Sequence, residues 1–284
     1  MTKRKATGGS KKATSTRPRA ASSAPPSMTS LLSMLGGGRR GKPIDQAQEL
    51  MYRAWEASTA ARRVALARQA LEISPDCADA YVLLVEHSTG GLAESIALLR
   101  EGVAAGERAL GRRVFKEDVG HFWGLLETRP YMRARAGLAQ RLREAGQHDE
   151  ALAHYRDLLR LNPNDNQGLR YELASYLFEL GLDDELTALL ARYEDDCSAT
   201  WAYAAALLAF RKGGDDEDAR QLLVAAQQVN PHVPAYLLGK KKLPKRLPDY
   251  IGMGDANEAV VYASDAVAGW KSVAGALDWL RASS

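Results

Sequence analysis

Helical patterns of apolar and polar positions follow one another along the chain from about residue 44 onward, with short turns between them. Gly146, Gly181 and Gly214 stand in three of these turns, at intervals of 35 and 33 residues. The stretch "AGLAQRLREAGQHDEALAHYRDLLRLNPND" and the later stretch "AYAAALLAFRKGGDDEDARQLLVAAQQVNPH" share one order of features: a helix, a glycine turn, a second helix and a proline turn. The pattern predicts a series of helical hairpins.

Residue size follows the same frame. The small residues expected where two antiparallel helices approach closely are Ala139, Ala151, Ala174 and Ala219, and the larger residues expected between hairpins are Tyr155, Leu190 and Leu223. Pro163 and Pro231 are expected to end two of the second helices, because proline cannot continue a helix. This frame resembles the tetratricopeptide repeat, and residues 132–165 and 200–233 match it best. The copy at 167–198 departs from it, with Leu186 at the usual alanine and Ser198 at the usual proline.

Two weaker copies stand upstream, "QAQELMYRAWEASTAARRVALARQALEISPDCADA" and "ADAYVLLVEHSTGGLAESIALLREGVAAGERAL". We therefore predict an all-α fold, a tetratricopeptide-type α-solenoid of about five hairpins whose concave surface is lined by the first helices. Residues 1–43 are predicted to be a disordered basic tail, residues 44–234 the repeats, and residues 235–284 a linker rich in proline and lysine followed by capping helices. Asp255 is the expected N-cap of the main capping helix.

The C-terminal stretch is more specific than the repeats. It contains "NPHVPAYLL" at 230–238, "GDANEAVVYA" at 254–263, Trp270 and "VAGALDWL" at 273–280. With "HFWGLLETRPYMRARAGLAQ" upstream, residues 45–282 resemble the suppressor-of-tumorigenicity-7 family, and more closely its bacterial tetratricopeptide members. The resemblance implies a helical-repeat protein of no established biochemical activity. Animal members are expected to carry membrane spans, but the longest apolar run here, "WAYAAALLAF", is about half of the length a spanning helix needs, so we expect a soluble protein.

Charge is distributed unevenly along the chain. Residues 1–43 carry ten Lys or Arg and no acidic residue, whereas the remainder is acidic overall, with 28 basic and 35 acidic residues. A basic tail of low apolar content is expected to stay disordered. It is either a solubilising extension, a targeting segment, or an arm that binds nucleic acid through phosphates. Cys77 and Cys197 suggest neither a disulfide framework nor a zinc site, which favours a reducing, cytoplasmic location.

Motifs for catalysis are weak. "GGGRRGKP" at 36–43 approaches a phosphate-binding loop, but Pro43 stands where a hydroxyl group must bind magnesium. The five histidines form neither HxxxH nor HExxH, and no Gly-x-Ser-x-Gly elbow occurs. We therefore expect no cofactor, no metal and no enzymatic activity.

The segment "HFWGLLETRPYMRAR" at 121–135 allows three interpretations. A hydrolase-type site would use His121 or Glu127 as the acid or base and Arg129, Arg133 and Arg135 as anion clamps. A packing interpretation places Phe122, Leu125 and Leu126 against the preceding hairpin, with Pro130 breaking the chain and the next helix starting at Tyr131. A partner-binding interpretation explains the abundance of arginine and aromatic residues, which dominate interface energetics.

The tetratricopeptide frame predicts which side chains face the groove. The candidates for partner contact are Arg129, Arg133, Gln140, Arg143, Tyr171, Ser175, Phe178, Trp201 and Arg211. Basic and aromatic residues together suit a protein or peptide partner with acidic and apolar side chains. The sequence thus favours a non-enzymatic scaffold, with a nucleic-acid accessory protein that uses the basic tail and a hydrolase centred on His121, Glu127 and Arg129 as the alternatives.

Overall fold

The computed structural model describes residues 41–283, and these are helical with no strand. The predicted basic tail lies outside the described residues except for its last three positions. The α-helices are α2 (Pro43–Glu56), α3 (Ala60–Ile73), α4 (Ala78–Glu86), α5 (Leu92–Glu117), α6 (Arg129–Glu144), α7 (His148–Leu161), α8 (Leu169–Glu179), α9 (Asp183–Arg192), α10 (Ala199–Gly213), α11 (Glu217–Val229), α12 (Val233–Leu237), α13 (Ala256–Ser272) and α14 (Ala276–Ala282). Two short 3₁₀ helices, η1 (Phe122–Gly124) and η2 (Leu126–Thr128), join α5 to α6. The predicted all-α fold is confirmed.

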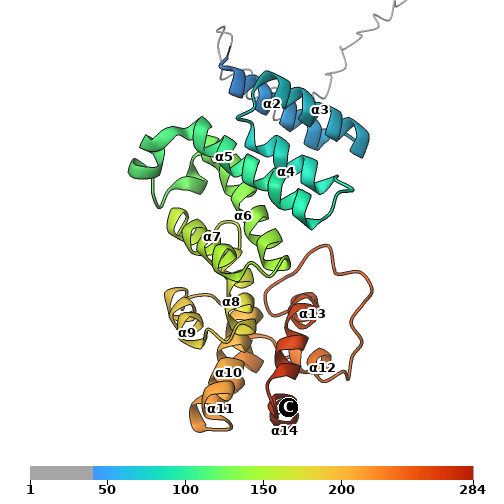
Figure 1. Ribbon diagram of the computed structural model, residues 1–284. Helices are drawn as coiled ribbons and strands as arrows, with labels where there is room; N and C mark the ends of the chain where they lie inside the picture. Colours follow the sequence, from blue (N-terminus) through green and yellow to red (C-terminus); the bar gives the residue numbers. More distant parts are fainter. Residues whose placement is uncertain (1–40, 284) are drawn as a thin grey trace, which may run out of the picture.

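Successive helices pair into hairpins that stack in chain order, from α2 and α3 to α10 and α11 (Figure 1). Two of the predicted turn glycines close their first helix in the left-handed region, with φ of +71° at Gly146 and +69° at Gly181. The Gln147 amide, which follows Gly146, donates a hydrogen bond to the Leu142 carbonyl and so completes a helix-ending motif. This motif needs a positive φ at position 146, which glycine adopts without the steric cost that a Cβ atom would add. These turns bring each second helix back along its first helix.

The predicted packing frame is confirmed in the core. Ala139, Ala151, Ala174 and Ala219 are at most 2% exposed, where the paired helices approach. One tyrosine from each of four first or second helices fills the space between neighbours; these are Tyr131, Tyr155, Tyr176 and Tyr203, all essentially inaccessible to solvent. Such burial removes large aromatic areas from water and therefore stabilises the contacts between hairpins.

The C-terminal helix α13 packs against the first helices α8 and α10 and is not limited to the end of the stack (Figure 1). Asp255 caps α13 as predicted, because its side chain accepts a hydrogen bond from the Glu258 amide. Where α10 meets α13, the Tyr203 ring of α10 packs against the rings of Tyr262 and Trp270 of α13, with ring centroids 5.5 and 6.4 Å apart. Since first helices line the concave surface of a solenoid, α13 covers that surface over the last two hairpins.

Candidate partner-binding surfaces

Three first helices bring polar and aromatic side chains together at the N-terminal end of the concave surface. The Asp79 carboxylate of α4 is fully buried and accepts hydrogen bonds from Nε and Nη2 of Arg133 on α6, at 2.8 and 2.6 Å. Gln48 of α2 donates a further hydrogen bond to Asp79, at 2.7 Å. The Arg133 guanidinium also lies over the Trp55 ring, 5.3 Å from its centroid. Arg133 therefore joins α2, α4 and α6 and is only partly available to a partner.

Tyr52 and Trp55 belong to this surface, although the sequence candidates did not include them. Their rings lie 5.9 Å apart on α2, and Trp55 is 36% exposed. They stand as far before Pro75 as the candidates Gln140 and Arg143 stand before Pro163. The same intervals, counted back from Pro75, therefore identify Tyr52 and Trp55 from the sequence alone.

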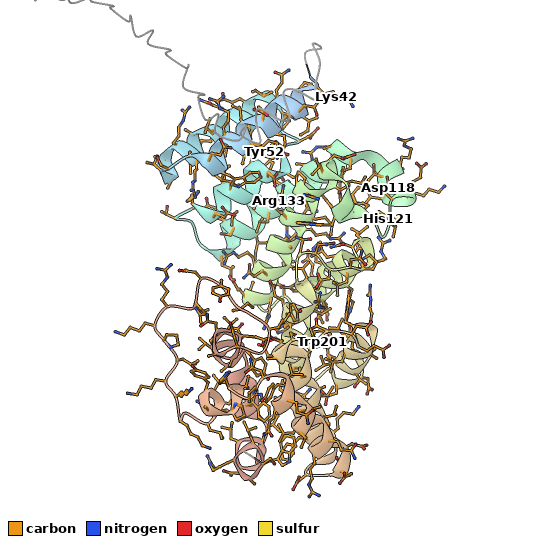
Figure 2. The ribbon with its side chains drawn as sticks, turned by 180° about the vertical axis from the view of Figure 1, so that it is seen from behind. Lys42, Tyr52, Asp118, His121, Arg133 and Trp201 are labelled. Atoms are coloured by element: carbon orange, nitrogen blue, oxygen red, sulfur yellow. The ribbon has the colours of Figure 1, made fainter. Side chains whose placement is uncertain are left out.

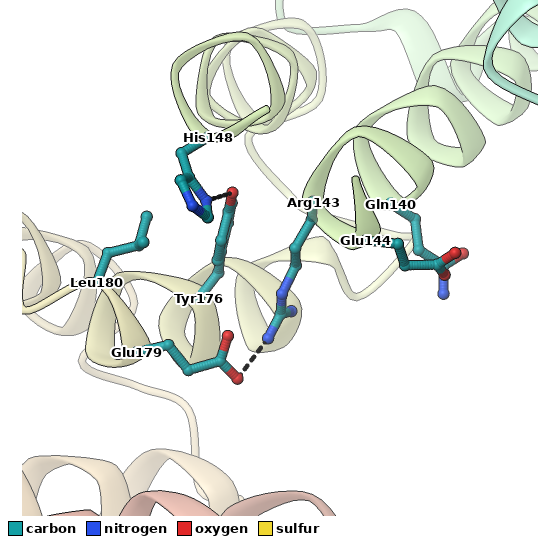
Figure 3. Close-up of a pocket in the computed structure, with 7 residues that line it drawn as sticks. All are labelled: Gln140, Arg143, Glu144, His148, Tyr176, Glu179 and Leu180. Carbon is teal, nitrogen blue, oxygen red and sulfur yellow. Dashed lines mark hydrogen bonds and ion pairs between the residues drawn. The ribbon is translucent and has the colours of Figure 1, made fainter. Parts of the chain in front are cut away.

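A hollow of about 530 Å³ opens between α6, α7 and α8 (Figure 3). Arg143 points toward α8, where its Nη2 lies 2.6 Å from Oε1 of Glu179 and its guanidinium covers the Tyr176 ring. His148 meets the Tyr176 hydroxyl at 2.7 Å, whereas Gln140 is exposed and extends away from this group. The charge of Arg143 is thus already matched by a carboxylate of the same chain.

The candidates on α8 have partners within the protein. The Tyr171 hydroxyl donates a hydrogen bond to Asp196, at 2.8 Å, and the Ser175 hydroxyl lies 3.4 Å from Glu179. Burial by itself would raise the pKa of the Asp196 carboxyl group. Hydrogen bonds from Ser198 and Tyr171 stabilise its charged form and outweigh burial, so its pKa is lowered. Both candidate side chains are partly exposed, so they keep some area for contact.

The remaining candidates lie in the part of the surface that other elements cover. Phe178 is 9% exposed, and Trp201, 4% exposed, packs against the Tyr171 ring. A Cβ atom on Gly269 of α13 would lie 3.4 Å from Phe178, which shows how closely α13 crosses this position. Arg211 stacks on the Phe178 ring at 3.6 Å and forms an ion pair with the carboxylate of Asp183. Phe178 and Trp201 therefore offer little area to a partner.

The segment 121–135 is in part a packed joint. Phe122 is fully buried against Phe115, with ring centroids 5.2 Å apart, as the packing interpretation requires. Two details differ from that interpretation: Leu126 is 55% exposed, and α6 begins at Arg129 with Pro130 in its first turn. Proline suits this position because the first amides of a helix have no acceptor within the helix.

His121 and Arg129 line a second hollow, of about 340 Å³, together with Trp123 and three asparagines. Glu127 is exposed and does not line this hollow, so the three residues of the hydrolase hypothesis do not converge on one space. Arg129 is held by its own segment: its Nε donates to the Trp123 carbonyl at 2.9 Å, and its guanidinium lies 5.3 Å from the Trp123 ring centroid. Within residues 41–283, no cluster of three His, Cys, Asp or Glu side chains could hold a metal ion.

The amino-acid sequence of this chain is similar to those of several known proteins. Over 254 residues the chain is 32% identical to the suppressor of tumorigenicity 7 protein-like of Rattus norvegicus, an alignment that covers 82% of this chain and 45% of the relative. It is 30% identical over 281 residues to the suppressor of tumorigenicity 7 protein of Mus musculus, with 83% and 48% covered. The chain thus spans about half the length of the curated relatives it matches.

Among solved structures, YrrB, described as a TPR protein with an unusual peptide-binding site, matches with a TM-score of 0.43 and 21% identity over 71% of this chain and 91% of YrrB. Within the described part of the chain, no helix combines the length and the apolar character needed to cross a membrane. The family model described as ST7 protein matches residues 41–283, and the chain therefore belongs to the ST7 family.

Proposed function

We propose that this protein is a non-enzymatic scaffold that binds a protein or peptide partner on the open part of its concave surface, along α2, α4 and α6. The proposal rests on one observation: α13 covers one part of the concave surface and leaves the other part open. This helix covers α8 and α10, while Tyr52, Trp55, Arg133 and Gln140 on the earlier first helices keep exposed area. Open first helices in a stack of hairpins form an extended surface of the kind that binds elongated partners.

The charges of the open surface favour apolar contacts and hydrogen bonds over simple attraction of an acidic partner. Arg133 is neutralised by Asp79 and Arg143 by Glu179. Trp55 combines partial exposure with an indole N–H that donates to no described residue, whereas Trp201, Trp270 and Trp279 each donate theirs. A tryptophan of this kind is typical of the residues that dominate interface energetics.

The test is a pull-down from a lysate of the source organism with a Trp55→Ala and Gln140→Ala double variant. Neither side chain holds a buried group, so the variant is expected to keep its helical content by circular dichroism. A matched control is Leu222→Ala on the second helix α11, because Leu222 is 38% exposed and Trp55 is 36% exposed. Loss of a protein that the wild type and the control both retain supports the proposal, and equal recovery by all three refutes it.

We propose no catalytic role for His121, Glu127 and Arg129, because they do not line a common space. A screen of the purified protein against ester, phosphate and glycoside substrates checks this view. Turnover that disappears in His121→Ala would contradict it.

A further inference from the structure

Two asparagines occupy the same place in different hairpins but have different partners. Asn162 is the C-cap of α7 and Asn230 is the C-cap of α11, and each precedes a proline. The Asn230 amide Nδ2 donates to the Asp255 carbonyl and to Oε2 of Glu258, both at 2.9 Å. At this place in the repeat, the protein itself uses asparagine to hold an incoming segment by a backbone carbonyl and a carboxylate.

Asn162 has no such segment to hold. It is 4% exposed, its side chain forms no hydrogen bond with any described residue, and it lines the hollow of about 340 Å³ beside η1. Neither polar atom of its amide is fully shielded from solvent, so the end of an otherwise buried side chain reaches the hollow. The hollow therefore offers a ligand a free amide donor on a side chain that its surroundings hold in place.

The other walls of the hollow are suited to an anionic group. The terminal nitrogens of Arg129 form no ion pair with a described carboxylate, while its Nε and its contact with the Trp123 ring fix the guanidinium in place. Asn164 and Asn166 add exposed amides, and no Asp or Glu lines the hollow. In contrast, Arg133, Arg143 and Arg211 are each paired with a carboxylate of this chain.

We propose that this hollow is a second binding site, specific for an Asp or Glu side chain of a peptide partner. The Arg129 guanidinium receives the carboxylate, since arginine binds carboxylates through paired, charge-assisted hydrogen bonds. The Asn162 amide donates to the same carboxylate or to a carbonyl of the peptide, as Asn230 does within the chain.

This site is separate from the concave surface. His121, on its rim, lies at the edge of the molecule and away from Arg133 (Figure 2). The inference goes beyond the scaffold function proposed above, and a failure of the groove variants leaves it standing.

The test uses a phage-displayed library of random nonapeptides selected on the full-length protein. One enriched peptide is then synthesised with fluorescein, and its affinity is measured by fluorescence anisotropy. We expect enriched peptides to share an acidic position, and Arg129→Gln and Asn162→Ala to weaken binding about ten- to a hundredfold. Replacing the acidic residue of the peptide by its amide is expected to have a similar effect.

The matched control is Arg113→Gln on α5, which removes the same charge from a side chain that is 83% exposed. It is expected to bind as the wild type does, as is the Trp55→Ala and Gln140→Ala variant. Three results would each overturn the proposal: no enrichment of peptides, enriched peptides without an acidic position, or equal affinity of the wild type and Arg129→Gln. Circular dichroism of each variant confirms that it is folded before binding is measured.

Discussion

The contrast between the two C-cap asparagines gives a sharp prediction for stability. Asn230→Ala removes the amide that holds the start of α13, whereas Asn162→Ala removes an amide with no described partner. The angle φ is negative at both positions, −148° at Asn230 and −138° at Asn162, so neither needs the left-handed conformation that would penalise alanine. Any difference between the two variants therefore comes from the side-chain contacts.

The magnitude follows from what each asparagine holds. Glu258 is 4% exposed, and a hydrogen bond to a charged group contributes about 1.5–3 kcal/mol, while the bond to the Asp255 carbonyl adds about 1 kcal/mol. We expect Asn230→Ala to lower the free energy of unfolding by about 2–4 kcal/mol. The Glu258 carboxylate keeps the Ala199 and Gly254 amides as donors, which limits the loss. Asn162→Ala is expected to stay within about 0.5 kcal/mol of the wild type.

Urea unfolding followed by far-ultraviolet circular dichroism and by tryptophan fluorescence measures both variants. Two of the five tryptophans, Trp270 and Trp279, lie in α13 and α14, so the fluorescence signal weights the C-terminal helices more heavily than circular dichroism does. In Asn230→Ala we expect the fluorescence transition to shift to lower urea than the circular dichroism transition. Equal stability of the two variants would refute the reasoning, because it would mean that the hydrogen bonds of Asn230 contribute nothing measurable.

Three further predictions concern the core. Arg133→Met leaves the buried Asp79 carboxylate without its arginine, so the free energy of unfolding should fall by about 3 kcal/mol, and the double variant with Asp79→Leu should regain part of this loss. A urea double-mutant cycle with purely additive losses would show that the pair is not coupled. Gly106→Ala places a Cβ atom 2.8 Å from Cβ of Tyr131, so overpacking should lower stability by about 1–3 kcal/mol, and an unchanged melting temperature would argue against this close approach. Burial, assisted by a neighbouring arginine, lowers the pKa of His154 below its usual value. The neutral ring therefore favours the folded state above about pH 6.5, and this contribution is lost as the pH falls through the lowered pKa, so His154→Gln should flatten the decline in stability between about pH 7 and pH 5. Identical pH profiles for the variant and the wild type would contradict the shift.

The sequence by itself determined the repeating parts of this protein. Hydrophobic period, residue size and turn residues act locally, so they predicted the hairpins, the small residues at the close approaches such as Ala139, and the glycine turns at Gly146 and Gly181. The same local chemistry predicted Asp255 as the cap of α13, since an N-cap depends on residues only three positions apart. The family resemblance was also present in the C-terminal motifs and is confirmed by the family match.

Only the tertiary structure decided which surfaces remain open. Periodicity identifies the apolar face of a helix but not the element that covers it, and α13 reaches α8 and α10 only after a long loop folds back. Phe178 and Trp201 were therefore candidates in the sequence and are buried in the structure. Likewise Arg133 meets Asp79 across 54 positions of sequence, a pairing that depends on the stacking of whole hairpins. Asn162 and Asn230 have the same local sequence setting, and what differs is the segment that tertiary packing brings to each of them.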